Sequence, residues 1–319
     1  MRKVIKTFTI FFASLLLMSA LVLVLFWSPD LEKSAITEKY SYKDSLFLAL
    51  NADNQIHYRD IGNKSAPTLV LIHGTSSSLH TWEPIADKLK ENFRLVMLDL
   101  PGHGLTGAST DRDYSRRAFV ESILSVLDHL NIASATLVGN SLGGAVSWQA
   151  ALEASDRVDS LILLAPAGAK RNQPSKSNIG FKILANGLGQ RLLKKITPRF
   201  IIERSLIQTV KDKNLVTDKM VTRYWELLKM KGNRQAMIDL VKSKQDSGNL
   251  ALSEPLSTPA LIIWGQNDEL LPVDMIRQFE KVLIDNQSHI LPNIGHLPQE
   301  EAVDTVAELI LTFCQHNQC

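Results

Sequence analysis

Short apolar runs alternate with stretches of helical spacing through most of the chain after residue 46. The runs predict eight strands, at residues 46–50, 55–60, 68–73, 94–99, 135–139, 158–165, 260–265 and 287–291. Apolar residues at helical spacing predict helices at residues 114–130, 141–154 and 300–314. This alternation favours an α/β fold in which helices cover a mostly parallel sheet.

The pattern changes over residues 169–250, where helical patterns follow one another with no strand between them. We therefore expect a helical insertion into the sheet domain. The insertion is strongly basic, with 18 Lys and Arg against 6 Asp and Glu, although the whole chain carries a net charge of only +2. Apolar and basic residues intermingle within it, most clearly over residues 181–196.

Two interpretations of this basic insertion remain open. A basic amphipathic helix can lie on an anionic membrane surface. Alternatively, the basic face meets the acidic remainder of the chain, and the apolar stripe packs on the core. Nucleic acid is not an expected partner, because the basic residues come without base-stacking aromatic residues or a nucleic-acid-binding motif.

The first 29 residues form a separate apolar segment. No charged residue occurs at 7–29, and residues 10–27 are almost wholly apolar, which is enough for a helix to span a bilayer of about 30 Å. Arg2, Lys3 and Lys6 precede the segment, so the rest of the chain is expected on the extracytoplasmic side, which is the periplasm in a Gram-negative bacterium. A cleaved signal peptide usually has a shorter apolar region of about 7 to 15 residues. We therefore expect a single-pass membrane anchor that is retained.

The pentapeptide Gly139-Asn140-Ser141-Leu142-Gly143 stands between a predicted strand and a predicted helix. A serine in such a turn needs strained backbone dihedrals, and the turn closes only if the flanking residues have almost no side chain. This is the sequence form of a nucleophile elbow. The turn presents the Ser141 hydroxyl and places the Leu142 amide at a helix start, where it faces developing negative charge.

Other polar residues follow the ends of predicted strands. His73-Gly74, Asp268 and His296 each come just after an apolar run. Because the carboxyl ends of parallel strands lie along one edge of a sheet, these residues are expected to converge with Ser141. An imidazole can take the proton of a serine hydroxyl, and a carboxylate can fix the tautomer of that imidazole. Glu269 adjoins Asp268, but the Trp-Gly-x-x-Asp spacing favours Asp268.

The chain order Ser141, Asp268, His296, with His73-Gly74 upstream, resembles the α/β-hydrolase superfamily. Further matches are Asp99-Leu100-Pro101-Gly102-His103-Gly104 and the stretch from Gly295 to Glu300. The resemblance implies an α/β-hydrolase fold with an eight-stranded, mostly parallel sheet. It also implies that Ser141 is the nucleophile, His296 the general base and then acid, and Asp268 the orienting carboxylate. The backbone amides of Leu142 and Thr75 would form the oxyanion hole.

In related hydrolases, an insertion at this place is a helical cap over the active site. The expected organisation is an N-terminal membrane anchor or signal peptide at 1–29, a linker at 30–45, the first part of the core at 46–168, the cap at 169–250 and the second part of the core at 251–319. A cap can exclude water and shape the acyl pocket.

The expected reaction is hydrolysis of apolar or lipid-like carboxylic esters through an acyl-serine intermediate. The context Asn140-Ser141-Leu142-Gly143-Gly144 looks like monoacylglycerol lipases and small carboxylesterases, and also like serine enzymes that hydrolyse carbon–carbon bonds of vinylogous diketones. Leu297 departs from the tryptophan expected after the histidine in many of the latter. A non-catalytic binding protein on this fold is a further alternative.

No cofactor is expected for this chemistry, and no metal site, because no histidine or cysteine cluster has the spacing of metal ligands. The two cysteines, Cys314 and Cys319, lie close together at the end of the chain. They can form a small disulfide loop or remain free thiols, and the sequence leaves both open.

Overall fold

The computed structural model describes residues 2–170, 178–246, 255–317 and 319. Within these ranges, eight strands form one sheet in the order β1-β2-β4-β3-β5-β6-β7-β8. β1 pairs antiparallel with β2, and β2 with β4, whereas the remaining pairs are parallel. The predicted eight-stranded, mostly parallel sheet is therefore confirmed. The strands are β1 Ser45–Ala49, β2 Gln55–Gly62, β3 Thr68–Ile72, β4 Arg94–Leu98, β5 Ala135–Asn140, β6 Val158–Leu164, β7 Ala260–Gly265 and β8 Asn286–Leu291.

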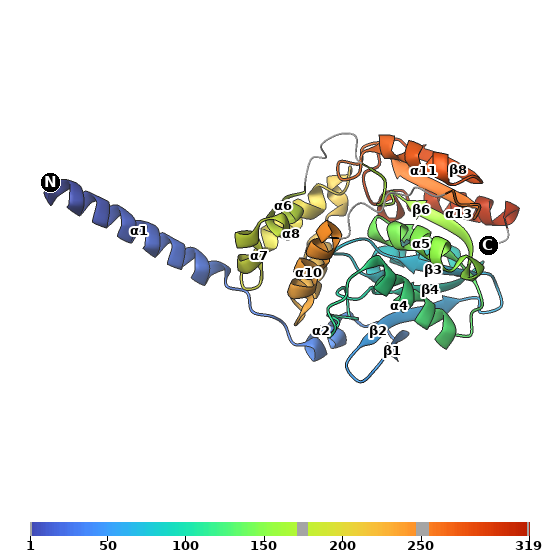
Figure 1. Ribbon diagram of the computed structural model, residues 1–319, viewed down its shortest axis with the longest axis horizontal. Helices are drawn as coiled ribbons and strands as arrows, with labels where there is room; N and C mark the ends of the chain where they lie inside the picture. Colours follow the sequence, from blue (N-terminus) through green and yellow to red (C-terminus); the bar gives the residue numbers. More distant parts are fainter. Residues whose placement is uncertain (1, 171–177, 247–254, 318) are drawn as a thin grey trace.

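Both faces of the central strands are buried, which explains why these strands are continuous apolar runs. Along β3, Leu69 and Leu71 join one hydrophobic cluster, and Val70 and Ile72 join the other. Successive side chains of a strand point to opposite faces, so the two clusters lie on opposite sides of the sheet. Helices cover the two faces (Figure 1). On one side are α3 Glu83–Leu89 and α13 Val303–His316, and on the other α4 Arg116–His129, α5 Leu142–Glu153 and α11 Ile276–Val282.

The insertion between β6 and β7 is helical, with no strand in its described part. Its helices, called the cap below, are α6 Ile179–Ala185, α7 Gly187–Leu193, α8 Arg199–Ile207, α9 Asp218–Lys229 and α10 Asn233–Asp246. The predicted end of the cap, residue 250, lies outside the described residues. Short elements complete the fold: α12 Pro298–Glu301, η1 Leu79–Trp82, η2 Ser155–Arg157, η3 Lys213–Leu215 and η4 Val273–Met275.

The N-terminal residues form helix α1, Arg2–Phe26, which projects away from the rest of the molecule (Figure 1). Large apolar side chains are exposed along it: Ile5, Phe8, Ile10, Phe11, Phe12, Leu15, Leu17, Met18 and Val24. Searching the described residues yields no helix with the length and apolarity required of a membrane span. The predicted transmembrane helix is therefore not supported.

The range 30–45, expected to be a linker, instead contains helix α2, Lys33–Tyr40. Ile36 of α2 is buried in a small cluster with Leu105 of the core and with Leu227 and Met230 of the cap. Ile36 thus packs this segment against both the core and the cap. The sequence of α2 has weak amphipathic character, so its apolar pattern does not predict a helix.

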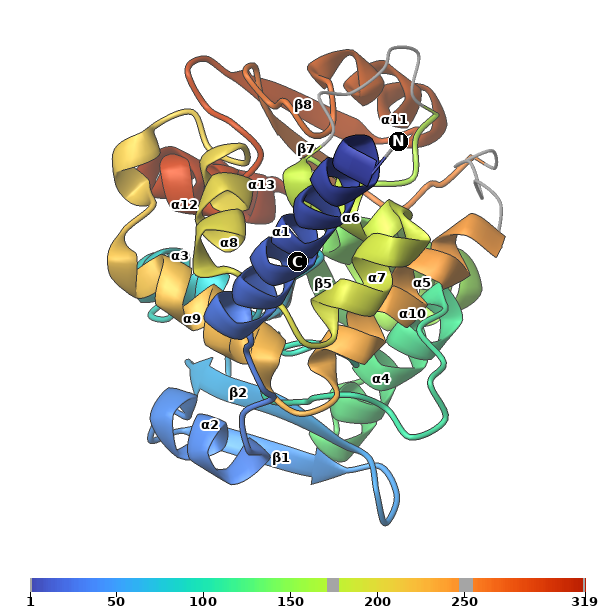
Figure 2. The same cartoon turned by 90° about the vertical axis from the view of Figure 1, so that its left-hand side faces the viewer.

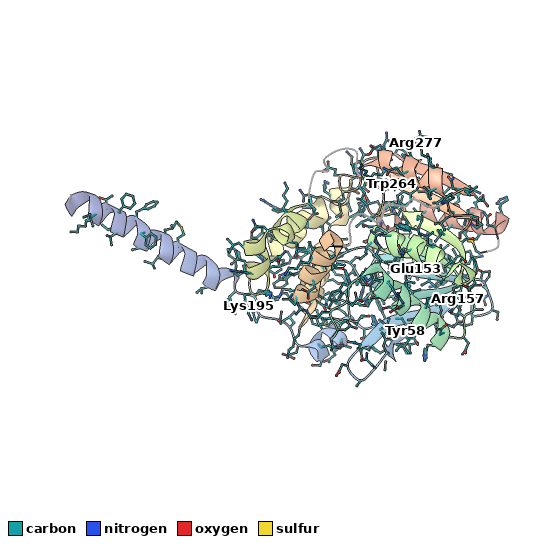
Figure 3. The ribbon with its side chains drawn as sticks, in the orientation of Figure 1. Tyr58, Glu153, Arg157, Lys195, Trp264 and Arg277 are labelled. Carbon is teal, nitrogen blue, oxygen red and sulfur yellow. A yellow bond between two sulfur atoms is a disulfide. The ribbon has the colours of Figure 1, made fainter. Side chains whose placement is uncertain are left out.

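The residues between α1 and α2 are tied to the cap. The Ser28 amide donates to the Lys195 carbonyl at 2.8 Å, and the Leu31 amide donates to the Lys229 carbonyl at 2.9 Å. Lys195 also lies over the Trp27 ring, with its Nζ 5.8 Å from the ring centroid. Figure 3 labels Lys195 near the base of α1. Figure 2 looks onto the side of the molecule from which α1 leaves, where α7, α8 and α9 surround its base.

Arg234 of α10 fastens the same segment from inside the cap. Its guanidinium is buried and donates to the Ser28 carbonyl at 2.8 Å and to the Asp30 carboxylate at 2.6 Å. A third contact reaches the Thr197 hydroxyl at 3.2 Å. A buried arginine is tolerated when its donors are satisfied in this way, and truncating it would leave these acceptors without a partner.

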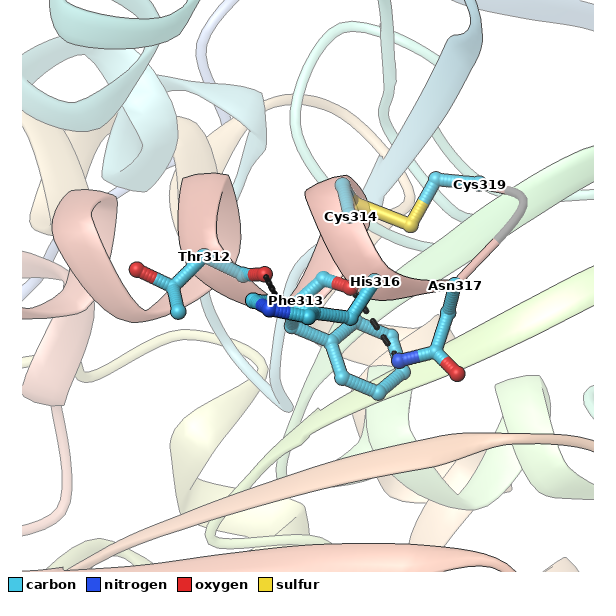
Figure 4. The surroundings of a disulfide bond; sticks show 6 residues. All are labelled: Thr312, Phe313, Cys314, His316, Asn317 and Cys319. Carbon is cyan, nitrogen blue, oxygen red and sulfur yellow. Dashed lines mark hydrogen bonds between the residues drawn. A yellow bond between two sulfur atoms is a disulfide. The ribbon is translucent and has the colours of Figure 1, made fainter.

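The two cysteines form a disulfide, Cys314–Cys319, with their Cα atoms 5.2 Å apart (Figure 4). Of the two alternatives that the sequence leaves open, the structure therefore shows the bonded one. Both residues pack against the hydrophobic cluster that α13 covers. The bond closes a very short loop and holds the end of the chain on the core.

Candidate active site

Ser141 stands at the turn between β5 and α5 with φ 53° and ψ −110°. A positive φ is costly for a residue with a side chain, so the surrounding structure must impose it. The Ser141 amide donates to the Leu164 carbonyl of β6 at 3.0 Å. Its carbonyl accepts from the amides of Ala145 at 3.0 Å and Ala167 at 2.9 Å. The strand, turn and helix predicted around this serine are all present.

Glycine is required on both sides of the turn. A Cβ on Gly139 would overlap the backbone of Gly143, and a Cβ on Gly143 would overlap the carbonyl oxygen of Ile72 in β3. A Cβ on Gly144 would lie 2.7 Å from Cβ of Pro166. The strand and the helix therefore approach more closely than any side chain allows, and this close approach raises Ser141 out of the sheet edge.

Asp268 and His296 follow β7 and β8, and their side chains meet. His296 Nδ1 lies 2.6 Å from Asp268 Oδ2. The other oxygen, Oδ1, accepts from the amides of Leu270 at 2.8 Å and Leu271 at 2.9 Å. A carboxylate held in this way keeps the proton on Nδ1 and leaves Nε2 free to accept one. The neighbouring Glu269 is exposed, so Asp268 is the carboxylate that the structure pairs with the histidine.

Asn140 ties the elbow to the histidine loop, a role that the sequence did not reveal. Its side-chain amide donates to the carbonyl of His296 and to that of Leu164, both at 3.1 Å. The His296 amide in turn donates to the Thr209 carbonyl of the cap at 2.7 Å. The backbone of His296 is thus fixed from both sides. A hydrogen-bonding residue directly before the serine was the signal available.

The loop after β3 orients a second amide. The Gly74 carbonyl accepts from His73 Nδ1 at 2.8 Å and from the Ser77 amide at 3.2 Å. A peptide unit is planar and trans, so the N–H of Thr75 points opposite to that carbonyl. Gly74, Thr75 and Ser141 line the same cavity. Thr75 and Leu142, which begins α5, therefore both border the cavity beside Ser141.

His73 keeps this peptide oriented as a neutral ring. Its Nε2 accepts from the Leu100 amide at 3.0 Å, so the proton is assigned to Nδ1, which donates to Gly74. Complete burial lowers the pKa of His73, and this effect outweighs the nearby Asp99 carboxylate. The ring is therefore neutral at physiological pH, and it acts through the backbone of the loop.

The cavity beside Ser141 has a volume of about 460 Å³ and is formed jointly by the core and the cap. A volume of this size accommodates a typical small organic ligand. Ser141, His296 and the loop after β3 border it from the core. None of the described lining residues is Lys, Arg, Asp or Glu. The wall is mostly apolar, with Ile183, Leu184, Leu193, Ile201, Ile202, Leu206, Leu228, Met237, Val241, Leu270, Leu271 and Leu297.

A second histidine–aspartate pair lies elsewhere in the fold, and its histidine also contacts a serine. His57 Nδ1 lies 2.7 Å from Asp99 Oδ2, and His57 Nε2 lies 2.8 Å from the Ser45 hydroxyl. Burial opposes ionisation of Asp99, but its neighbours, His57 foremost, lower the pKa of this carboxyl far below its usual value. Asp99 also accepts from the amides of Leu79 and Leu105, each at 2.7 Å. Because Ser45 lies in a regular strand and outside the cavity lining, this array is structural.

Comparison with known proteins gives a family match and several relatives. A family model described as alpha/beta hydrolase fold matches residues 67–303. An uncharacterized hydrolase of Bacillus subtilis (strain 168) is 26% identical, covering 81% of this chain and 93% of the relative. A 2-hydroxy-6-oxononadienedioate/2-hydroxy-6-oxononatrienedioate hydrolase of Pseudomonas putida is 26% identical, covering 89% and 100%.

Two solved structures are similar in fold. The 2-hydroxy-6-oxo-6-phenylhexa-2,4-dienoate hydrolase from Rhodococcus sp. strain RHA1 has a TM-score of 0.74 at 23% identity, covering 85% of this chain and 98% of its own. A membrane phospholipase A described as a bacterial virulence factor has a TM-score of 0.74 at 22% identity, covering 98% of both chains. At such identities the similarity shows the fold alone.

Proposed function

This chain belongs to the alpha/beta hydrolase fold family, and from that membership we propose that it is a serine hydrolase of apolar carboxylic esters. Ser141 is the nucleophile, His296 the general base and then acid, and Asp268 the carboxylate that holds the imidazole. The observation that carries the proposal is that Ser141 and His296 border one apolar cavity, with Asp268 bonded to the far side of the imidazole.

The reaction follows from this arrangement. His296 Nε2 takes the proton of Ser141 as its oxygen attacks the ester carbonyl, and the imidazolium that forms is stabilised by Asp268. The amides of Leu142 and Thr75 receive the negative charge on the carbonyl oxygen. His296 then returns the proton to the leaving alcohol. Water, activated by the same imidazole, cleaves the acyl-serine and frees the acid.

Hydrolysis of a carbon–carbon bond is the second candidate, and the named relatives favour it. The relative from Pseudomonas putida and the Rhodococcus structure are both named for such substrates. The lining of the cavity, by contrast, favours an ester as the substrate. Those substrates carry one or two carboxylates by name, and the described cavity lining offers no Lys or Arg to pair with them. Burying an unpaired carboxylate is strongly unfavourable.

A substrate panel tests the choice. We expect kcat/KM for a medium-chain p-nitrophenyl ester or a monoacylglycerol to exceed that for 2-hydroxy-6-oxo-6-phenylhexa-2,4-dienoate by about 100-fold, equivalent to about 2.7 kcal/mol of transition-state binding. Steady-state kinetics on the purified chain measure both values. Preferred turnover of the dienoate would instead assign the protein to the carbon–carbon class. The absence of turnover and of fluorophosphonate labelling would favour a binding protein.

We also propose that the protein works at a lipid surface outside the cytoplasm. Three observations support this: α1 exposes a row of apolar side chains, the cap exposes Leu188, Leu192 and Phe200 near basic residues, and Phe200 packs edge-on against Phe26 at the end of α1. The disulfide suits an oxidising compartment. The membrane phospholipase fold also extends over nearly the whole chain, most of α1 included.

Vesicle binding checks the contribution of the cap. Lys194 and Lys195 are exposed beside these apolar residues, and each basic residue near an anionic bilayer contributes about 1 kcal/mol. The double variant Lys194→Glu, Lys195→Glu should therefore bind phosphatidylglycerol vesicles at least about 30-fold more weakly, with binding to neutral vesicles unchanged. The matched control is Lys88→Glu, Lys90→Glu at the end of helix α3. Equal binding to anionic and neutral vesicles by the unmodified chain would contradict the proposal.

A further inference from the structure

Tyr224 of cap helix α9 reaches the loop that carries Thr75. Its hydroxyl lies 3.0 Å from the hydroxyl of Ser77, and both residues line the cavity. We propose that Tyr224 is a positioning residue that holds this loop from the cap, so that the second oxyanion donor is in place only when α9 is seated. The proposal rests on the serine hydrolase function proposed above.

The ends and the middle of this loop are held by different parts of the molecule. The core fixes the ends, since His73 binds the Gly74 carbonyl and the Leu79 amide donates to Asp99 at 2.7 Å. The cap contacts the middle. Besides the Ser77 contact with Tyr224, the Ser76 hydroxyl lies 3.5 Å from Sδ of Met237 in α10. Thr75 lies between the end fixed by the core and the residues contacted by the cap.

Ser77 links the phenol to the oxyanion peptide directly. The Ser77 amide donates to the Gly74 carbonyl at 3.2 Å, and this carbonyl belongs to the same peptide unit as the Thr75 N–H. A rotation of that peptide would break the bond to Ser77. Holding the Ser77 side chain against Tyr224 therefore restricts the direction of the Thr75 amide.

The same phenol lies beside the helix that follows His296. The phenol lies close to Thr81 and to the Glu300 carboxyl of α12, both of which affect its ionisation. Thr81 donates to Glu300 and accepts from the Gln299 side chain at 3.0 Å. Burial, and then the nearby Glu300, raise the pKa of Tyr224, so the hydroxyl keeps its proton as a donor. One cap side chain thus contacts the oxyanion loop and lies near Glu300, which follows the histidine in the chain.

Removal of the hydroxyl tests this role. Tyr224→Phe keeps the ring and should lower kcat for a p-nitrophenyl ester about tenfold. KM should change less than twofold, because the Thr75 amide stabilises the transition state more than it stabilises the bound substrate. Ser77→Ala should give the same loss, and the double variant should lose no more than either single variant, because both remove one interaction. Hydrogen exchange at the amides of residues 75–78 should become faster in Tyr224→Phe, a readout that needs no substrate.

Tyr40→Phe is the matched control. The Tyr40 hydroxyl donates to Glu226 of α9, the helix that carries Tyr224, at 2.6 Å. Tyr40 is not among the described residues that line the cavity. This variant should keep kcat and the loop exchange rates. Unchanged kcat in Tyr224→Phe, additive losses with Ser77→Ala, or an equal loss in Tyr40→Phe would each overturn the proposal. An inactive, unlabelled wild type would instead refute the hydrolase function, and unchanged loop exchange would then overturn this inference separately.

Discussion

Ser141→Ala is expected to lower kcat/KM for a p-nitrophenyl ester by about 10⁴-fold or more. The substitution removes the atom that forms the acyl intermediate, while the cavity and the oxyanion amides remain. Substrate binding should change little, because the removed hydroxyl is small. Steady-state kinetics measure the loss, and a fluorophosphonate probe with mass spectrometry of the labelled peptide shows whether Ser141 is the site of attack.

Ser45→Ala provides a control within the same chain. Ser45 contacts His57, which is bonded to Asp99, but it lies outside the cavity lining. We expect this variant to keep its activity and its labelling within a factor of about two. The reaction requires a serine that borders the substrate cavity and lies beside oxyanion donors, and Ser45 does not line that cavity. Persistent labelling in Ser141→Ala that disappears in Ser45→Ala would reverse the assignment.

Gly143→Ala is expected to lower the free energy of unfolding by about 4 kcal/mol or more. The added methyl group would overlap the Ile72 carbonyl oxygen in the middle of the sheet. A backbone atom in a paired strand cannot rotate away, so α5 and β3 would have to separate. Urea denaturation followed by circular dichroism measures the change, and activity should fall with the displaced elbow.

Gly187→Ala is the matched control for this substitution. Gly187 begins helix α7, and a Cβ added there meets no atom within 4 Å. Its effect on the free energy of unfolding should stay within about 1 kcal/mol and can be favourable, because alanine is the better helix former. A Gly143→Ala protein as stable as this control would show that the close packing of the elbow is not required.

Local patterns in the sequence were enough to predict the core of this fold. Strands buried on both faces appear as continuous apolar runs, and glycines around Ser141 report a backbone contact that no side chain allows. The convergence of Ser141, Asp268 and His296 follows from one geometric rule, that parallel strands end at one edge. These features depend on residues near each other in the chain or on the topology alone.

The contacts that the sequence did not reveal are polar and distant. Tyr224 and Ser77 are 147 positions apart, and the Asn140 side chain bonds to a carbonyl 156 positions away. The first pair depends on how the cap sits on the core, and the second on how two distant loops of the core meet. Neither arrangement has a periodic signature in the sequence. For the apolar segment at the N-terminus, by contrast, the sequence predicts a feature that the structure does not support. Its apolar composition predicts a membrane span, whereas the described residues contain no helix with the length and apolarity of one.

The paired arrays around His57 and His296 bear on how catalytic sites are recognised by geometry. Among the described residues, the histidine–aspartate pairs of the two arrays have nearly equal distances, 2.7 Å for His57–Asp99 and 2.6 Å for His296–Asp268. A search template built on side-chain groups alone would therefore also match the array that contains Ser45. What separates them is the main chain beneath the alcohol: Ser45 lies in an ordinary extended segment, whereas Ser141 has φ 53°. A template that also includes the φ angle of the serine would select Ser141 and reject Ser45.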